Sequence, residues 1–213
     1  MKNMNLKTNR ILFLFYITLF LQCGPEKPGN ADSSLAFALL APSENSDQIL
    51  EVTTVPEGSH FITTVKATSS FAWVYVDLGS GGIKSSENEA WDLRWKRFVG
   101  GTNGGTSGTG TGGSCKTNST NWADTFTFAS CMIENDALQS QTGDGGFGSA
   151  NESASPSIWG WYNYDANLHQ LSSKNEIYLI RSFDSADFYV IQMLDYYSAA
   201  GTSGYPKFRW KKL

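Results

Sequence analysis

Apolar and polar residues alternate with a period of two along much of the chain after its first fifty residues. Between residues 91 and 97, tryptophan and leucine alternate with charged side chains, which is the pattern of a strand with one buried face. Similar runs, separated by turn-rich intervals, predict an all-β single domain of twisted antiparallel sheets. Only residues 134–141 are predicted to form a short helix. The other predicted strands are Phe61–Val65, a run that carries Phe71, Trp73 and Tyr75 on one face and ends near Gly79, Phe126–Phe128, Ile158–Tyr164, Ile177–Ile180, Phe188–Tyr197 and Phe208–Trp210.

The composition agrees with this pattern and excludes several classes of protein. Of the 213 residues, 40% are hydrophobic and 14% are aromatic, only 17% are charged, and 21 are glycine. Many aromatic and few charged residues favour β structure with glycine turns over coiled coils or a disordered chain. The formal net charge is −4 and no basic run is present, so nucleic acid is not expected as a partner.

The N-terminus is predicted to direct export. Lys2, Lys7 and Arg10 precede an apolar run over residues 11–21. As a helix this run would rise only about 16 Å, roughly half the hydrocarbon thickness of a bilayer, which is typical of a signal peptide and too short for a membrane span. Cys23 follows at once, at the position of the lipidated cysteine of a bacterial lipoprotein. The alternative is an ordinary secreted protein in which Cys23 is incidental.

These features divide the chain into three predicted parts. Residues 1–22 are the signal peptide, residues 23–48 are the lipidated N-terminus and a tether, and residues 49–213 are the β domain. Removal of the signal peptide takes away three positive charges and no negative ones, which makes the remaining chain more acidic than the net −4 of the whole. Anionic lipid would repel such a domain, so we expect the lipid anchor alone to hold it at the membrane.

Two further cysteines, Cys115 and Cys131, leave two possibilities open. In an oxidising compartment they would close a loop whose disulfide contributes roughly 3 kcal/mol. They would otherwise be free, buried thiols, because sequence alone does not show how far apart they lie. The chain contains no Cys-x-x-Cys pair, which excludes a thioredoxin-like or zinc-ribbon site.

The segment Gly100–Gly113 has eight glycines among its fourteen residues. It contains a Gly-x-Gly-x-x-Gly pattern at Gly108, Gly110 and Gly113, but a turn-rich stretch follows where a dinucleotide-binding fold would need a helix. Two interpretations remain. The segment is a flexible loop, or it is a tight crossing of backbones that only glycine allows.

No arrangement of residues typical of an enzyme is present. No serine lies in a Gly-x-Ser-x-Gly elbow, and neither His60 nor His169 belongs to a His-Glu-x-x-His motif. The sequence therefore predicts no catalytic residues. A hydrolase that uses a pair of carboxylates stays open as an alternative, because the sequence does not place any two carboxylates opposite each other.

Two blocks of sequence stand out. The first block is Trp91–Phe98 with Thr102–Gly113, and the second is Trp161–Asp165, Ile177–Arg181, Phe188–Tyr197, Gly204 and Phe208–Trp210. Together they resemble the HmuY family of bacterial haem-binding lipoproteins. The resemblance implies an all-β fold that holds one haem between two extended segments. It also implies a role in iron acquisition, in which the protein captures free haem or haem from host haemoproteins at the outer membrane and passes it to an outer-membrane receptor.

The resemblance also implies two axial ligands to the haem iron, which in this family are commonly a histidine pair and in some members methionines. Counting back from Arg181 places the matching position near Tyr164, and His169 follows five residues later. The second ligand is expected between the two blocks, where Met132 is the only His or Met. His169 could also be a solvated loop histidine, and Met132 a core filler. No metal site other than the haem iron is expected.

Trp159, Trp161 and Tyr162 are candidates to flank the porphyrin, although packing in a β core would account for them equally well. His60 and Met193 are expected to be structural. The alternative function is that of a surface lipoprotein on the same scaffold without haem, acting as an adhesin or as a carbohydrate- or protein-binding module.

Overall fold

A computed structural model describes residues 51–140 and 151–213, so the predicted signal peptide, Cys23 and the tether lie outside the described residues. The described part contains fourteen strands and no helix, which confirms the predicted all-β fold. Within these residues, therefore, no helix is long and apolar enough to cross a membrane. Every strand pairing in this part of the chain is antiparallel.

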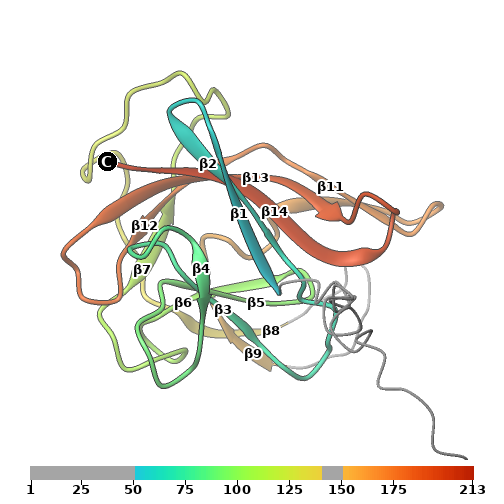
Figure 1. Ribbon diagram of the computed structural model, residues 1–213, viewed down its shortest axis with the longest axis horizontal. Coiled ribbons are helices and arrows are strands. Elements are labelled where there is room, and N and C mark those ends of the chain that lie inside the picture. The colour runs from blue at the N-terminus through green and yellow to red at the C-terminus, as the bar shows by residue number, and fades with distance from the viewer. Residues whose placement is uncertain (1–50, 141–150) are drawn as a thin grey trace, which may run out of the picture. The chain divides into compact units, whose positions relative to one another are not determined.

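The largest sheet has six strands in the order β1-β2-β14-β13-β12-β7 (Figure 1). Strand β14 is formed by the last residues of the chain and lies between β13 and the N-terminal strand β2. The strands of this sheet are β1 (Val52–Glu57), β2 (His60–Val65), β7 (Gly113–Lys116), β12 (Ile177–Arg181), β13 (Phe188–Tyr197) and β14 (Ser203–Lys212).

A four-stranded sheet and two hairpins complete the fold. The smaller sheet has the order β4-β3-β5-β6, and the hairpins are β8-β9 and β10-β11. Figure 1 shows the smaller sheet and the β8-β9 hairpin together on one side of the six-stranded sheet. These strands are β3 (Val74–Asp77), β4 (Ile83–Ser85), β5 (Leu93–Lys96), β6 (Val99–Thr102), β8 (Ala137–Ser140), β9 (Asn151–Ala154), β10 (Tyr162–Asp165) and β11 (Gln170–Ser173).

Tryptophans form much of the core between the two sheets. The ring of Trp95 on β5 stacks on Phe208 of β14 with centroids 6.0 Å apart, and it meets the edge of Trp161 at 6.4 Å. Both tryptophans are 1% exposed or less, as are Leu93 and Tyr178. Leu93 and Trp95 thus lie in the core as the alternation predicts, and their burial stabilises the fold. The other face is not exposed as predicted, because Asp92, Arg94 and Lys96 are also buried.

The aromatic face predicted at residues 71–79 is present only in part, because Trp73 and Tyr75 share the face that bears Arg94 but Phe71 does not belong to the strand. Strand β3 begins only at Val74, and its buried side chains are those of the opposite face, whereas Phe71 is 92% exposed. Trp73 instead covers the outer surface of the smaller sheet, where the Arg94 guanidinium lies 4.0 Å from the centre of its ring. The contact with the Arg94 cation thus explains why Trp73 lies on the outer surface of the sheet, although its place in the pattern resembles that of a core residue.

Three other predicted elements differ in the structure. Residues 137–140 form strand β8 instead of a helix, because pairing with β9 overrides local helix preference; residue 141 lies outside the described residues. The segment Phe126–Phe128 has no strand partner and runs through a loop and a turn. Residues 156–160 form turns, so the strand predicted from Ile158 begins only at Tyr162.

The glycine-rich segment is a tight crossing of backbones. It links β6 to β7, and the Gly112 amide donates to the Asn103 carbonyl over 2.8 Å. A side chain at Gly104 would overlap the carbonyl oxygen of Gly112. The second interpretation of this segment therefore holds, because the two arms of the loop approach too closely for any Cβ.

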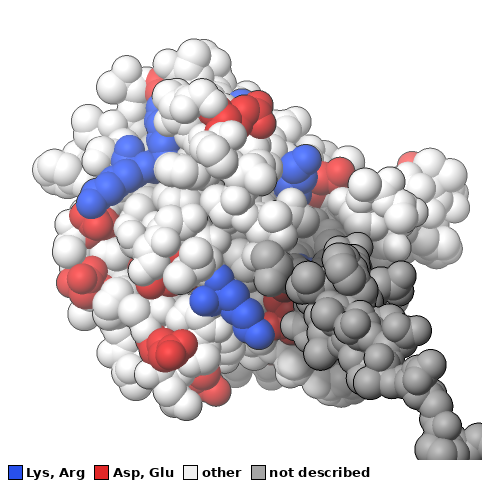
Figure 2. All heavy atoms as spheres, in the orientation of Figure 1, with Lys and Arg blue, Asp and Glu red and all other residues white. Residues whose placement is uncertain are grey.

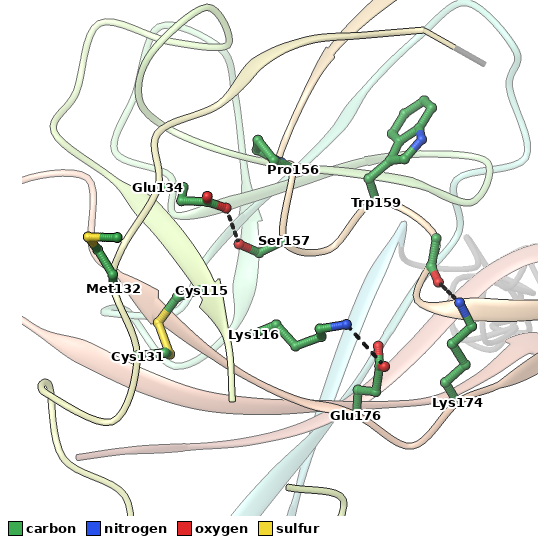
Figure 3. Close-up of a pocket in the computed structure, with 11 residues that line it drawn as sticks. Cys115, Lys116, Cys131, Met132, Glu134, Pro156, Ser157, Trp159, Lys174 and Glu176 are labelled. Atoms are coloured by element: carbon green, nitrogen blue, oxygen red, sulfur yellow. Dashed lines mark hydrogen bonds and ion pairs between the residues drawn. A yellow bond between two sulfur atoms is a disulfide. The ribbon is translucent and has the colours of Figure 1, made fainter. Parts of the chain in front are cut away.

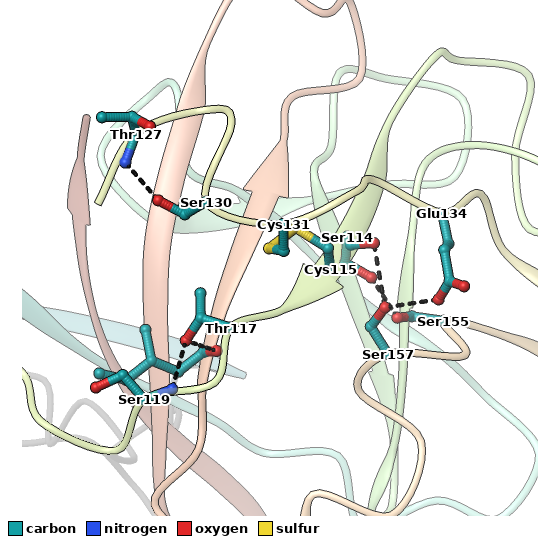
Figure 4. Close-up of a disulfide and its surroundings, with 11 residues drawn as sticks. Ser114, Cys115, Thr117, Ser119, Thr127, Ser130, Cys131, Glu134, Ser155 and Ser157 are labelled. Atoms are coloured by element: carbon teal, nitrogen blue, oxygen red, sulfur yellow. Dashed lines mark hydrogen bonds between the residues drawn. A yellow bond between two sulfur atoms is a disulfide. The ribbon is translucent and has the colours of Figure 1, made fainter. Parts of the chain in front are cut away.

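A disulfide joins Cys115 on β7 to Cys131, with 5.8 Å between their Cα atoms (Figure 4). It closes the loop after β7 over the outer face of the large sheet. Trp122, Phe126, Cys131 and Ile133 pack there against the buried side chains Ile177, Leu179 and Val190. Of the two possibilities that the sequence left open, the structure has the bonded one.

Replacing both cysteines with alanine should lower the free energy of unfolding by about 3 kcal/mol, because the unfolded chain gains the freedom of the open loop. Urea denaturation monitored by tryptophan fluorescence measures this loss. The wild-type protein unfolded under reducing conditions should give the same value as the double variant. Equal stability of the variant and the oxidised wild type would contradict the prediction.

Candidate functional site

A cavity of about 390 Å³ lies beside the disulfide, at the edge of the large sheet formed by β7. Its walls come from β7, from residues 131–134, from the turn at 156–160 and from residues 174–176, which lead from β11 into β12 (Figure 3). This volume falls within the range of small-molecule sites in proteins. The lining residues are Cys115, Lys116, Cys131, Met132, Glu134, Pro156, Ser157, Trp159, Gly160, Lys174 and Glu176.

Met132 contributes a thioether and Trp159 an indole ring to the lining of this cavity. Met132 directly follows the disulfide-bonded Cys131, and its side chain is 84% exposed. Such exposure is unusual for a methionine, which is commonly buried, and it leaves the thioether sulfur accessible to a ligand. Trp159 is partly exposed on a turn that the fully buried Ile158 anchors in the core. Figure 3 shows the two side chains at opposite sides of the cavity.

The charged residues of the cavity are arranged in short contacts. Lys116 lies 3.3 Å from the Glu176 carboxylate, and the other oxygen of that carboxylate accepts the Tyr178 hydroxyl over 2.8 Å. Burial, together with this bond to Glu176, raises the pKa of Tyr178 far above its ordinary value, so the hydroxyl remains a donor. The Lys174 ammonium donates to the Gly160 carbonyl over 2.7 Å.

On the face of the molecule drawn in Figure 2, basic and acidic side chains form small separate groups within a largely uncharged surface. The lining of the cavity is likewise mixed. Lys116 and Lys174 are basic, and Glu134 and Glu176 are acidic. The Glu134 carboxylate accepts the Ser157 hydroxyl over 3.0 Å. The cavity therefore combines a few apolar side chains with four charged ones, which makes it more polar than most small-molecule sites.

Tyr164 and His169 contact each other near the tip of the β10-β11 hairpin. The Tyr164 hydroxyl lies 2.7 Å from Nδ1 of His169. His169 is exposed and has a φ of 53°, a left-handed conformation in the turn that the Asp165 carboxylate closes by accepting the Asn167 and Leu168 amides. When Nδ1 carries the proton and donates it to Tyr164, the lone pair of Nε2 is free to bind a metal.

The structure thus brings only some of the predicted site residues together. Met132 and Trp159 line one cavity, whereas Tyr164 and His169 form a separate pair that does not line it. Trp161 is a core residue whose indole donates to the Phe98 carbonyl over 2.9 Å, and Tyr162 packs against the ring of Phe98. Of the three predicted pocket aromatics, Trp159 is therefore the one that a ligand in the cavity can reach.

The two remaining candidates have structural surroundings. The ring of His60 meets the edge of Trp122 with centroids 5.6 Å apart, and Met193 is completely buried. Over residues 51–140 and 151–213, no three His, Cys, Asp or Glu side chains are grouped so that they could hold a metal ion. Sequence reasoning missed Lys116, Lys174 and Glu176, because isolated surface charges carry no signal until the fold places them around one cavity.

The family described as "HmuY protein" matches residues 69–210, well over half of the chain. The chain belongs to the HmuY family. The match includes most of the described domain, from the start of the smaller sheet to strand β14, and it confirms the family that the two sequence blocks indicate. No curated protein matches the chain.

Several solved structures of bacterial proteins share this fold. The first, a candidate lipoprotein of Bacteroides fragilis, is 19% identical with a TM-score of 0.56, over 78% of this chain and 96% of that one. Another, a candidate HmuY-like haem-binding protein of Bacteroides vulgatus, is 14% identical with a TM-score of 0.56, over 76% and 96%. The apo HmuY analogue of Tannerella forsythia is 15% identical with a TM-score of 0.56, over 75% and 96%. These similarities extend over nearly the whole of each relative, so this chain has the HmuY fold.

Proposed function

We propose that this HmuY family protein binds haem in bacterial haem acquisition. In this proposal it is exported by residues 1–22, anchored in the outer membrane through lipid on Cys23, and passes captured haem to an outer-membrane receptor. Free haem and host haemoproteins are the sources, and the protein carries out no chemistry on its cargo. The observation that carries the proposal is the exposed Met132 thioether in a cavity that also presents the Trp159 ring.

The donor set suits haem. A thioether and an imidazole are both established axial ligands of haem iron, and the indole ring offers a flat apolar surface to the porphyrin. Met132 would supply one ligand from the cavity. His169 does not line the cavity, so we propose it as the iron ligand of an alternative site at the β10-β11 hairpin and not as the partner of Met132 on one iron. Tyr164 would orient its ring there through the bond to Nδ1. The disulfide next to Met132 holds its backbone in place, which limits the ordering that binding would otherwise require.

A haemin titration followed by the Soret band tests the proposal. The wild type should show a saturable one-to-one shift, and Met132→Ala should weaken binding by at least about tenfold, or roughly 1.4 kcal/mol. If haem binds at the hairpin instead, His169→Ala should weaken binding by a similar factor while Met132→Ala should not. Tyr164→Phe should have a smaller effect, because it removes only the group that orients His169.

Matched variants in the same loops serve as controls. Phe128→Ala changes an exposed residue within the loop closed by the disulfide, and Leu168→Ala changes the exposed neighbour of His169. Neither should alter the titration. A strong loss in Tyr164→Phe with none in His169→Ala would instead make the Tyr164 oxygen the ligand. A wild-type spectrum no different from that of an unrelated protein would refute haem binding and favour the adhesin or carbohydrate-binding alternative.

A further inference from the structure

The cavity has two chemically different sides. Met132, the disulfide and Pro156 provide soft or apolar surface, whereas Lys116 and Lys174 lie away from Met132, with the Glu176 carboxylate between them (Figure 3). The two lysines come from separate parts of the chain. Lys116 ends β7, and Lys174 directly follows β11 at the base of the β10-β11 hairpin. The fold therefore places two cations in a lining that also holds the carboxylates of Glu134 and Glu176.

Neither lysine has all its hydrogen-bonding capacity used. Each ammonium group carries three donors. Lys116 directs one toward Glu176, which also accepts the Tyr178 hydroxyl, so this carboxylate is shared between two donors. Lys174 donates to a neutral carbonyl oxygen, that of Gly160, and among the described residues no carboxylate lies within ion-pair distance of it. Among the described residues, Lys174 therefore forms no ion pair and keeps donors for a ligand.

We infer that Lys174 and Lys116 bind the carboxylates of the ligand, and that the cavity selects flat, apolar molecules carrying a pair of acidic groups at one edge. This inference rests on the proposed function, since haem has such an edge in its two propionates. The recognition does not involve iron. A metal-free porphyrin with both carboxylates should be bound through the same two lysines, whereas an esterified porphyrin should lose this contribution.

Three ligands separate carboxylate recognition from iron coordination. Purified protein would be titrated with haemin and with haemin dimethyl ester by absorbance, and with metal-free protoporphyrin IX by fluorescence. Lys174→Met and Lys116→Met should each weaken binding of haemin and of protoporphyrin about 3- to 10-fold, the range for a partly exposed charge pair. Binding of the dimethyl ester should not change. Raising the salt concentration should weaken the binding of haemin and protoporphyrin, which carry carboxylates, and should leave the binding of the dimethyl ester unchanged.

The control variant is Lys212→Met. Lys212 is similarly exposed, at 59% of its side chain against 50% for Lys116, but it pairs with Asp187 and does not line the cavity. Lys174→Arg, which retains the charge, should retain most of the affinity.

The outcomes distinguish the two proposals. If the wild type binds the ester as tightly as haemin, or if the lysine variants bind normally, the inference is refuted while haem binding stands. Lysine-dependent binding of protoporphyrin without any specific haemin spectrum would uphold carboxylate recognition and refute the iron ligands. Failure to bind any of the three ligands would refute both.

Discussion

The variant Gly105→Ala should fail to fold under conditions in which Gly58→Ala folds normally. Gly105 has a φ of +58°, where a side chain is strained, and its added Cβ would overlap the carbonyl oxygen of Asp136. That oxygen accepts the Thr106 amide over 3.0 Å, so it belongs to the backbone contact that closes the glycine-rich loop. The overlap requires backbone to move, and we expect a loss of about 4 kcal/mol or more, a large part of the stability of a domain of this size.

Gly58 provides a matched control because its φ is +60° and a Cβ there would meet no atom within 4 Å. Gly58→Ala should therefore cost only the conformational penalty, about 1 kcal/mol. Circular dichroism and urea denaturation of the two variants measure the difference. Similar stabilities for both would show that the loop can open without cost and that the crossing is not required by the fold.

Asp92→Ala should be the next most damaging change. The Asp92 side chain is almost completely buried and accepts three backbone amides. One carboxylate oxygen accepts the Leu78 amide over 2.9 Å and the Gly79 amide over 3.3 Å, and the other oxygen accepts the Phe183 amide over 2.9 Å. It thereby joins the end of β3 to the turn between β12 and β13. Its removal leaves these donors without partners, and we expect a loss of roughly 3 kcal/mol.

Asp124→Ala is the control, because Asp124 is exposed and accepts only from its own turn, at Ser119 and Asn121. It should cost less than about 1 kcal/mol. Burial raises the pKa of Asp92 in the folded protein above its ordinary value of 3.8. The Asp92 carboxyl therefore loses its proton at a lower pH in the unfolded chain than in the folded protein. The advantage of the wild type over Asp92→Ala should therefore decrease as the pH rises through the interval between the two pKa values. An advantage that grows with pH would contradict this assignment.

The sequence correctly predicted the strands whose apolar residues form a clear pattern. Strands β12 and β13 are apolar and central, and the structure has them where the pattern places them. The failures have specific physical causes. Trp73 resembles a core residue in sequence, but it covers the outward-facing cation of Arg94. Residues 137–140 have no strong strand pattern, and their pairing with β9 depends on residues that follow in the chain by more than ten positions.

The candidate site was only partly accessible to sequence reasoning. Met132 could be found because methionine and histidine are scarce in this chain, and Trp159 because it lies in an aromatic cluster. Lys116 could not be found, since it reaches the cavity through the pairing of β7 with β12, which sets Lys116 opposite Tyr178. Such long-range register is fixed by the whole sheet. Likewise, the separation of His169 from the cavity follows from the length of a hairpin that the sequence pattern did not delimit.

The place of β14 in the large sheet has a consequence for how the protein is made. Because β14 pairs with both β2 and β13, a nascent chain that has not reached Ser203 leaves both of these strands with open edges. The hairpin of β1 and β2 then has no sheet to join, so the domain cannot assemble stepwise from its N-terminus. The large sheet can therefore close only after β14 has been synthesised. Until then β2 and β13 keep unpaired backbone edges, and such edges can pair with other chains and lead to aggregation.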